Sequence, residues 1–154
     1  MRFLPLLLTL LACHGVGAPD FVSSRGVSYR YDFQAIPWDP AQIEAQEAGF
    51  VGALEDFTYF VYPPVQVSKA LSKAQVAVVP DAFPCGIFSD AQCNGLEYDE
   101  QIEVRRFDCP AQSALTHELA HWIRQAVRGD PDIAHTDTNL WQAANAHYEG
   151  GCSE

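Results

Sequence analysis

The sequence has few positively charged residues relative to negatively charged ones. Its 154 residues include nine Lys and Arg against 20 Asp and Glu, which gives a formal net charge of −11 at pH 7. Arg105-Arg106 is the only adjacent pair of cations, so no larger basic patch is available for a phosphate backbone or an anionic bilayer. This balance argues against a nucleic-acid partner and against electrostatic docking on a membrane. It favours cationic partners or substrates only weakly, because an acidic surface is often just a solubility feature.

The apolar run at the start of the chain is too short to span a membrane. A helix needs roughly 20 apolar residues to cross a bilayer, and this run covers only residues 3–12. Its position behind the charged Arg2 is typical of an export signal. We therefore expect residues 1–12 to be a signal peptide and the mature protein to be exported.

The end of the apolar run, Leu10-Leu11-Ala12-Cys13, resembles a bacterial lipobox. The resemblance implies cleavage before Cys13 and a lipid on its sulfur. The mature protein would then be a cell-envelope lipoprotein that meets the membrane only through this anchor. Cleavage after Val16-Gly17-Ala18 is the alternative and would give a secreted protein. We expect residues 13–24 to form a polar tether and residues 25–154 a single domain, because the chain is too short for two.

Cysteine is sparse, and no C-x-x-C motif is present. Apart from Cys13, the chain has Cys85, Cys93, Cys109 and Cys152. An even number of cysteines in an exported protein indicates disulfides, and four cysteines allow three pairings. Cys85 and Cys93 flank a loop that contains Gly and Asp, which favours a local bridge and leaves Cys109 to pair with Cys152. Thiolate ligation of zinc is the rival interpretation, and the oxidising compartment argues against it.

The remaining sequence has no internal repeat or low-complexity segment, and its 48% hydrophobic content is that of a globular protein. The patterning predicts an α+β fold, with helices packed on a small sheet. Strands are expected at residues 27–33, 75–79 (as a central strand) and 97–107 (near a sheet edge), helices at about 40–56, 110–128 and 137–148, and a short turn or helix at 67–71.

The sequence from His117 to His121 has the form H-E-x-x-H. Side chains four residues apart lie on the same face of a helix, so the two imidazoles can hold one Zn²⁺ between them. Glu118 can then take the proton from a water molecule that the zinc acidifies. The alternative is an amphipathic helix with two His on its polar face. Against that alternative stands an apolar surface at helical spacing, formed by Leu115, Leu119, Trp122, Ala126 and Val127.

Helix boundaries also surround this motif. Asp108-Cys109-Pro110 offers a cap and a Pro near the first turn, whereas Gly129 and Pro131 mark the end of the helix. Two aromatic features are expected to serve packing only. Trp122 and Trp141 are predicted in the core or between helices, and the run from Phe57 to Phe60 beside the sheet.

The order of elements together with His117-Glu118-Leu119-Ala120-His121 resembles the minimal catalytic half of the zincin metallopeptidases. Asp132-Ile133-Ala134-His135 and Leu140-Trp141 are similar to the SprT-like and YgjP-like members, in which a third His at a helix start is followed by an aromatic residue. In that superfamily the strand before the metal helix pairs with the substrate backbone. The resemblance gives this part to the residues from Ile102 to Arg106.

A catalytic zinc needs three protein ligands and an open position. His135 is the preferred third ligand, because it lies in a turn-rich loop that can fold back over the metal helix. Glu149 is the main alternative, followed by Asp137 and His147. Asp132 or Asp137 could accept a hydrogen bond from the second ring nitrogen of a ligand.

We therefore expect an exported zinc metallopeptidase that hydrolyses a peptide or protein substrate, with Glu118 as general base and His117, His121 and His135 as metal ligands. No stabiliser of the transition state is assigned; Arg124, His147 and Tyr148 are candidates. Two other classes remain open. One is a catalytically inactive protein of the zincin fold, and the other is a disulfide-stapled cell-envelope binding protein.

Overall fold

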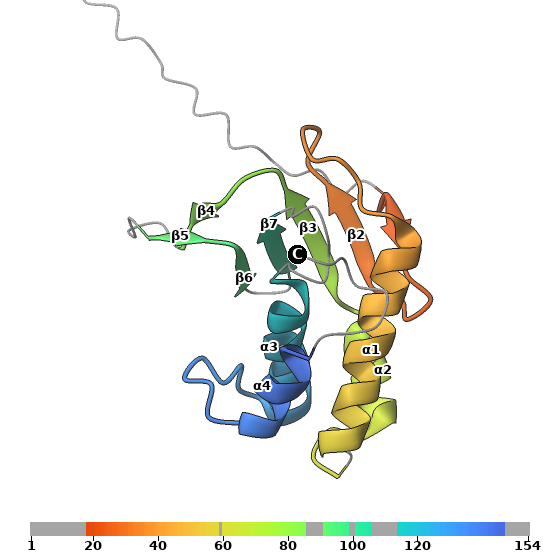
Figure 1. The fold of residues 1–154 in the computed structure, drawn as a ribbon, viewed down its shortest axis with the longest axis vertical. Helices are drawn as coiled ribbons and strands as arrows, with labels where there is room; N and C mark the ends of the chain where they lie inside the picture. Colours follow the sequence, from red (N-terminus) through yellow and green to blue (C-terminus); the bar gives the residue numbers. More distant parts are fainter. Residues whose placement is uncertain (1–17, 59, 86–90, 99–100, 106–113, 147–154) are drawn as a thin grey trace, which may run out of the picture.

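A mixed sheet and four helices make up the fold (Figure 1). The structure is a computed structural model that describes residues 18–58, 60–85, 91–98, 101–105 and 114–146. Helices α2, α3 and α4 gather at one end of the sheet, and α1 runs along the length of the molecule. The predicted α+β class is confirmed.

The main sheet has five strands in the order β1-β2-β3-β7-β6. Their bounds are β1 Phe21–Val22, β2 Ser28–Tyr31, β3 Gln75–Val79, β6 Gly95–Tyr98 and β7 Gln101–Arg105. The three inner strands β2, β3 and β7 run parallel to one another, whereas β1 and β6 are antiparallel to their neighbours. The prediction that residues 75–79 form a central strand is confirmed. Val76 and Val78 are buried there, as a strand covered by helices requires.

The strand predicted at 97–107 lies near a sheet edge as expected, but its predicted extent is wrong. The chain forms two antiparallel strands here, and the edge strand is β6 rather than β7. Both edges of β7 are hydrogen bonded, one to β3 and one to β6, and Ile102 and Val104 are fully buried. The residues from Ile102 to Arg105 therefore present no open backbone edge to a substrate. Arg106 lies outside the described residues.

The sheet begins earlier than the predicted boundary at residue 25. β1 lies within the segment 13–24 that was expected to be a tether, and its residues pair with β2. Asp20 extends this contact, because its backbone N–H donates to the carbonyl of Tyr29 and its carboxylate accepts from the backbone N–H of Tyr31. Two residues are too few to show a strand periodicity, which is why the sequence pattern missed them.

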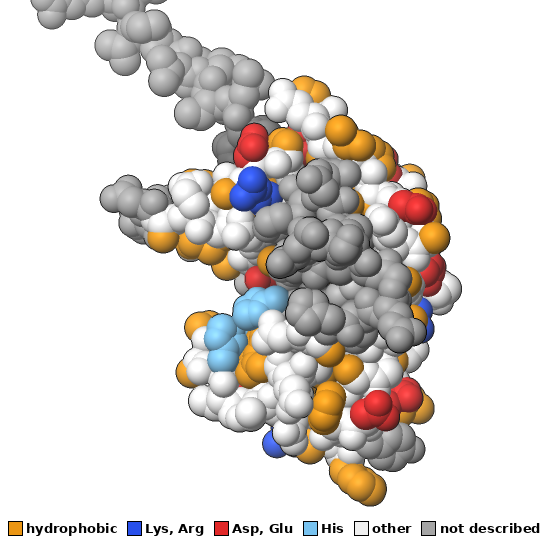
Figure 2. All heavy atoms as spheres, in the orientation of Figure 1, with side chains coloured by type: hydrophobic (Ala, Val, Ile, Leu, Met, Phe, Trp, Pro, Cys, Tyr) orange, Lys and Arg blue, Asp and Glu red, His pale blue; other side chains and the backbone are white. Residues whose placement is uncertain are grey.

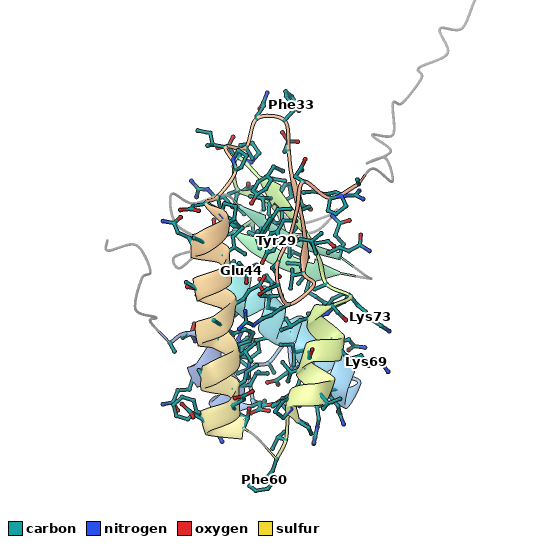
Figure 3. All side chains as sticks on the ribbon, turned by 90° about the vertical axis from the view of Figure 1, so that its right-hand side faces the viewer. Tyr29, Phe33, Glu44, Phe60, Lys69 and Lys73 are labelled. Atoms are coloured by element: carbon teal, nitrogen blue, oxygen red, sulfur yellow. A yellow bond between two sulfur atoms is a disulfide. The ribbon has the colours of Figure 1, made fainter. Side chains whose placement is uncertain are left out.

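Helix α1 spans Pro40–Thr58, close to the predicted range. The Asp39 carboxylate accepts a hydrogen bond from the backbone N–H of Ala41 and so caps the helix as expected. The aromatic run at its end does not fill space beside the sheet. Phe57 is 43% exposed and Phe60 is 96% exposed, at the tip of the molecule far from Tyr29 (Figure 3). Helix α2, Pro64–Leu71, follows directly and confirms the weakly predicted helix at 67–71.

Helix α3, Leu115–Arg128, carries the H-E-x-x-H motif and begins later than the predicted residue 110. The cap candidate at 108–110 lies outside the described residues. Gly129 ends the helix in the left-handed conformation, with φ 81°, as predicted. Helix α4, Thr138–Ala144, is shorter than the predicted 137–148, with the C-cap at Asn145.

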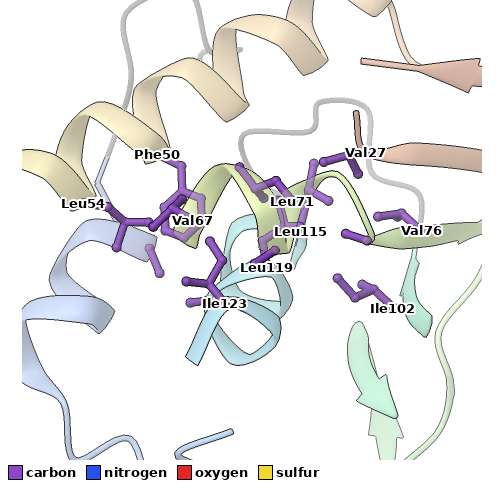
Figure 4. Close-up of a cluster of buried hydrophobic side chains, with 14 of the residues drawn as sticks. Val27, Phe50, Leu54, Val67, Leu71, Val76, Ile102, Leu115, Leu119 and Ile123 are labelled. Carbon is purple, nitrogen blue, oxygen red and sulfur yellow. The ribbon is translucent and has the colours of Figure 1, made fainter. Parts of the chain in front are cut away.

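The hydrophobic core lies where α3 meets the sheet and the other helices (Figure 4). Helix α3 contacts α1, α2 and α4 as well as β6 and β7, so its position depends on most of the fold. The core side chains labelled in Figure 4 are Val27, Phe50, Leu54, Val67, Leu71, Val76, Ile102, Leu115, Leu119 and Ile123. No helix in the described part of the chain has the length and hydropathy to cross a bilayer.

A small two-stranded sheet projects as an arm before β6. It pairs β4 (Phe83–Pro84) with β5 (Gln92–Cys93). The predicted disulfide between Cys85 and Cys93 closes this arm and is confirmed. The predicted pairing of Cys109 with Cys152 lies outside the described residues, as does Cys13.

Candidate metal centre

Three imidazoles converge beside the edge strand. His117 and His121 come from the first two turns of α3, and His135 reaches them from the loop before α4. The Nε2 atom of His121 lies 3.2 Å from Nε2 of His117 and 3.4 Å from Nε2 of His135. Figure 2 shows these side chains grouped on the hollowed side of the molecule. The structure thus brings together the three ligands that the sequence favoured.

The spacing of the ring nitrogens around His121 fits an ion with tetrahedral coordination. Zinc–nitrogen bonds of 2.0–2.1 Å at tetrahedral angles place neighbouring nitrogens roughly 3.3–3.4 Å apart. The two measured separations, 3.2 and 3.4 Å, lie close to that value. All three donor atoms lie within 4.8 Å of one another. The group could therefore hold one metal ion.

The second ring nitrogen of His121 sets which nitrogen is available for a metal. Its Nδ1 lies 2.6 Å from the carbonyl oxygen of Pro131, which can only accept, so Nδ1 carries the proton and donates it. Nε2 is then an acceptor that points toward the other imidazoles. The predicted acceptors for such a bond were Asp132 and Asp137. For His121 that prediction is wrong, because the partner is a backbone carbonyl.

The surroundings of His117 and His121 favour the neutral forms of their rings. Burial, and then the neighbouring His121 and His135, lower the pKa of His117 to about 4. Burial also lowers the pKa of His121, while its bond to Pro131 works in the opposite direction. Neutral rings with lone pairs directed at one point repel one another weakly, and a cation between them would remove that repulsion. Metal binding also requires neutral imidazole.

The loop that carries His135 is organised by a buried carboxylate. Asp132 is 6% exposed, and its Oδ1 accepts from the backbone N–H and the hydroxyl of Thr136. Its Oδ2 accepts from the backbone N–H of Asp137 and from the indole N–H of Trp141. Burial alone would raise the pKa of Asp132, but these hydrogen bonds outweigh it and hold the pKa far below its usual range. Asp132 thus fixes the loop rather than a ring nitrogen.

Two residues of this loop have a backbone that L-amino acids adopt rarely. The φ angle is 53° at Asp132 and 54° at His135. Such conformations cost on the order of 1–3 kcal/mol each and persist only where the surroundings impose them. Here the Asp132 carboxylate and the carbonyl of Asp132, which accepts from the backbone N–H of His135, impose them. These two residues belong to the loop that brings His135 close to the histidines of α3.

Asp137 is not a ligand in this arrangement. One carboxylate oxygen caps α4 by accepting from the backbone N–H of Leu140. The other accepts from the Tyr62 hydroxyl at 2.7 Å and from Arg124 at 3.2 Å. Arg124 also forms an ion pair with Asp130, so its guanidinium contacts the loop at two residues, Asp130 and Asp137. Arg124 is not among the residues that line the cavity at the histidines, and its candidacy as a transition-state stabiliser stays a prediction.

The two tryptophans differ in what they contact. Trp122 packs against the core and donates its indole N–H to the carbonyl of Ala70, as a packing residue does. Trp141 is buried as predicted, but its ring also lies 4.2–4.8 Å, centroid to centroid, from all three imidazoles. Trp141 thus packs against the three imidazoles, and the prediction of a packing role is confirmed.

Glu118 lies in the same cavity as the histidines and is 6% exposed. Burial, and then the charge of Glu97, raise the pKa of Glu118 to about 7. A hydrogen bond with the backbone of Glu97 has the opposite effect and lowers it. The side chain packs on Gly95: a methyl group added there would lie 2.6 Å from Glu118 Oε1 and in still closer contact with Ala114. Glycine in a strand often marks such a close approach, and that signal could have identified Gly95 from the sequence.

The cavity around these groups measures about 250 Å³. Its walls come from the edge strand on one side and the loop after α3 on the other. The lining residues are Gly95, Leu96, Glu97, His117, Glu118, His121, Pro131, Ile133 and His135. The sequence predicted the four metal-site residues of this set and missed the contribution of the edge strand. Glu149, His147 and Tyr148 lie outside the described residues.

Comparison of the chain with protein-family models, with curated proteins and with solved structures finds no match. The functional argument therefore depends on the residues of this site.

Proposed function

We propose that the protein is a zinc-dependent peptidase whose metal is held by His117, His121 and His135, with Glu118 as general base. The observation that carries the proposal is the convergence of three imidazoles in one cavity with a buried carboxylate, with Nε2 of His121 lying 3.2 Å and 3.4 Å from Nε2 of the other two. Three protein nitrogens leave a fourth tetrahedral position open, as catalytic zinc sites require.

Zinc bound there would supply Lewis acidity, lowering the pKa of a water molecule to about 7 and polarising a carbonyl. Glu118 follows the first ligand in sequence, and its carboxylate faces the cavity. It would accept a proton from the attacking water and pass it to the leaving amine. A group with a pKa near 7 is suited to both transfers.

The edge strand β6 is the better candidate to bind an extended peptide than the strand predicted from the sequence. Among the strands that the structure describes, β6 pairs only with β7, so its other edge faces the cavity side. An extended chain can add to such an edge through backbone hydrogen bonds. The peptide would then lie across the cavity, with its scissile bond near Glu118.

Metal content and turnover test the proposal together. The purified protein is expected to contain about one zinc per chain and to cleave members of a peptide library. Glu118→Gln should retain zinc and lose activity by roughly 10²–10⁴-fold, the usual contribution of a general base. Full activity in this variant would remove Glu118 from the mechanism.

Two histidine variants test the ligand set. His135→Ala should bind zinc far more weakly, whereas His147→Ala, which removes the alternative histidine, should bind it as wild type does. The reverse pattern would show that the third ligand is wrong. Protein without zinc would favour a disulfide-stapled binding protein, and zinc without turnover an inactive member of the zincin fold.

A further inference from the structure

The side chains of β6 alternate between the two faces of the sheet. Gly95 faces α3, because an added methyl group there would contact Ala114 and Glu118. Glu97, two residues further along, projects to the same face as Gly95. Glu97 also lines the cavity and is close enough to Glu118 to act on its charge. The strand thus delivers a second carboxylate beside the proposed general base.

The charge of the cavity wall is of one sign. Among the described lining residues the carboxylates are Glu97 and Glu118, and none of these residues is Lys or Arg. In the proposed function Glu118 is the general base, and the three imidazoles are the metal ligands. Glu97 is the second charged side chain among the described residues that line the cavity.

The rest of the wall is apolar. Leu96, Pro131 and Ile133 are apolar residues that also line the cavity, and Ile133 is 79% exposed. Apolar walls reduce the solvent around a carboxylate and so strengthen its attraction for a cation. They also suit the methylene stem of a long basic side chain. The wall therefore combines a carboxylate that can bind a cationic group with apolar residues that can contact the methylene stem of a basic side chain.

We propose that this cleft selects substrates that carry an ammonium or guanidinium group, and that Glu97 is the residue that recognises it. The inference rests on the proposed function, because it places the substrate in the cavity of the metal site. The three histidines are the independent sign that a ligand enters this cavity. The cation could be a Lys or Arg side chain or the free amino terminus of a peptide, since both present the same chemistry to a carboxylate.

Binding to the zinc-loaded Glu118→Gln protein tests this inference without the need for turnover. The probes are four fluorescent peptides of one sequence, with Lys or Gln at a central position and a free or acetylated amino terminus. A charge-assisted hydrogen bond to Glu97 should favour the cationic partner by about tenfold or more. Preference for Lys identifies a side-chain site, whereas preference for the free terminus identifies an α-amino site.

Variants of Glu97 assign the preference to this residue. Glu97→Gln should abolish it, and Glu97→Lys should invert it toward a matched peptide with Glu. Glu55→Gln is the control, because it removes the same charge from an exposed position on α1 that does not line the cavity. Zinc content and melting temperature, measured on each protein, show that the variants fold.

Equal binding of the four peptides, no binding of any, or a preference that persists in Glu97→Gln overturns the inference. The failure of the proposed function looks different. Zinc-loaded wild-type protein would then bind the cationic peptide tightly but cleave none, and the recognition site would stand without the hydrolase.

Discussion

Gly95 sets how closely the edge strand approaches the metal helix. An added Cβ would lie 2.8 Å from Cγ of Glu118, which is closer than real Cβ contacts, and closer still to the side chain of Ala114. Neither neighbour can yield easily, because α3 is fixed on its other sides by α1, α2 and α4. A methyl group would therefore displace Glu118 or push β6 away from the helix.

Gly95→Ala should keep the metal and lose catalysis. The three atoms nearest to the added methyl belong to Ala114 and Glu118 rather than to an imidazole, so zinc content should stay near that of wild type. Overpacking should lower the free energy of unfolding by about 1–3 kcal/mol, and displacement of Glu118 should reduce kcat/KM by roughly tenfold or more. Zinc analysis, urea unfolding and peptide cleavage measure the three quantities.

Gly52→Ala is the matched control for this variant. Gly52 is exposed in α1, and a Cβ there would meet nothing within 4 Å. The substitution should raise stability by about 0.5–1 kcal/mol through helix propensity and leave kcat/KM unchanged. If Gly95→Ala cleaves peptides as wild type does, Glu118 is not positioned by β6.

The proposed metal site depends on the conformation of the loop between α3 and α4. This loop carries His135 and also Pro131, the acceptor for His121 Nδ1. Four hydrogen bonds to the Asp132 carboxylate hold it. The positions of the proposed ligands thus depend on a carboxylate that is not itself one of them.

Asp132→Asn should weaken zinc binding although it leaves the three histidines in place. An amide nitrogen at one of the two oxygen positions would face the donors that now point at it, either at Thr136 or at Asp137 and Trp141. Loss of a supporting carboxylate of this kind typically reduces metal affinity by about 10–100-fold. Competition with a chromogenic chelator measures the affinity directly.

Asp56→Asn controls for the loss of one negative charge, because Asp56 is exposed on α1. The melting temperature of the metal-free proteins separates a loop effect from general unfolding. Asp132→Asn protein that is folded and binds zinc as tightly as wild type does would show that the loop forms without this carboxylate.

Over the whole molecule, the features that the sequence predicted are those with a local cause. The cap at Asp39, the strand 75–79 and the spacing of His117 and His121 each follow from nearby residues. The bridge between Cys85 and Cys93 was also local in sequence. The patterns could not show that β6 forms the edge, because strand order depends on tertiary contacts.

Burial of a polar side chain was equally hidden in the sequence. Glu47 lies on the buried face of α1, where the periodicity of the helix shows only the apolar positions. It is 1% exposed and accepts a hydrogen bond from the Tyr29 hydroxyl at 2.6 Å. The pair joins the long helix to β2, and Oε2 of Glu47 has no hydrogen-bond partner. A contact of this kind ties the stability of the whole domain to pH.

The sign of that dependence follows from the pKa of Glu47. Burial raises it above the ordinary value of 4.5, although hydrogen bonds from Tyr29 and Ser23 oppose the rise. The fold therefore favours the protonated carboxyl. The stability that this preference contributes is complete below pH 4.5 and is lost as the pH rises through the higher pKa of the folded state.

Glu47→Gln should remove this contribution to the pH dependence. Glutamine keeps an acceptor for Tyr29 and cannot ionise, so the variant should gain stability relative to wild type as the pH rises from 4.5 through the raised pKa of Glu47. Each unit by which the folded pKa is raised corresponds to about 1.4 kcal/mol of that gain. Urea unfolding of both proteins at several pH values gives the difference, in which the titrations at the metal site cancel. Glu55→Gln, on the exposed face of the same helix, should run parallel to wild type. Parallel curves for Glu47→Gln as well would mean that Glu47 is already ionised in the folded protein.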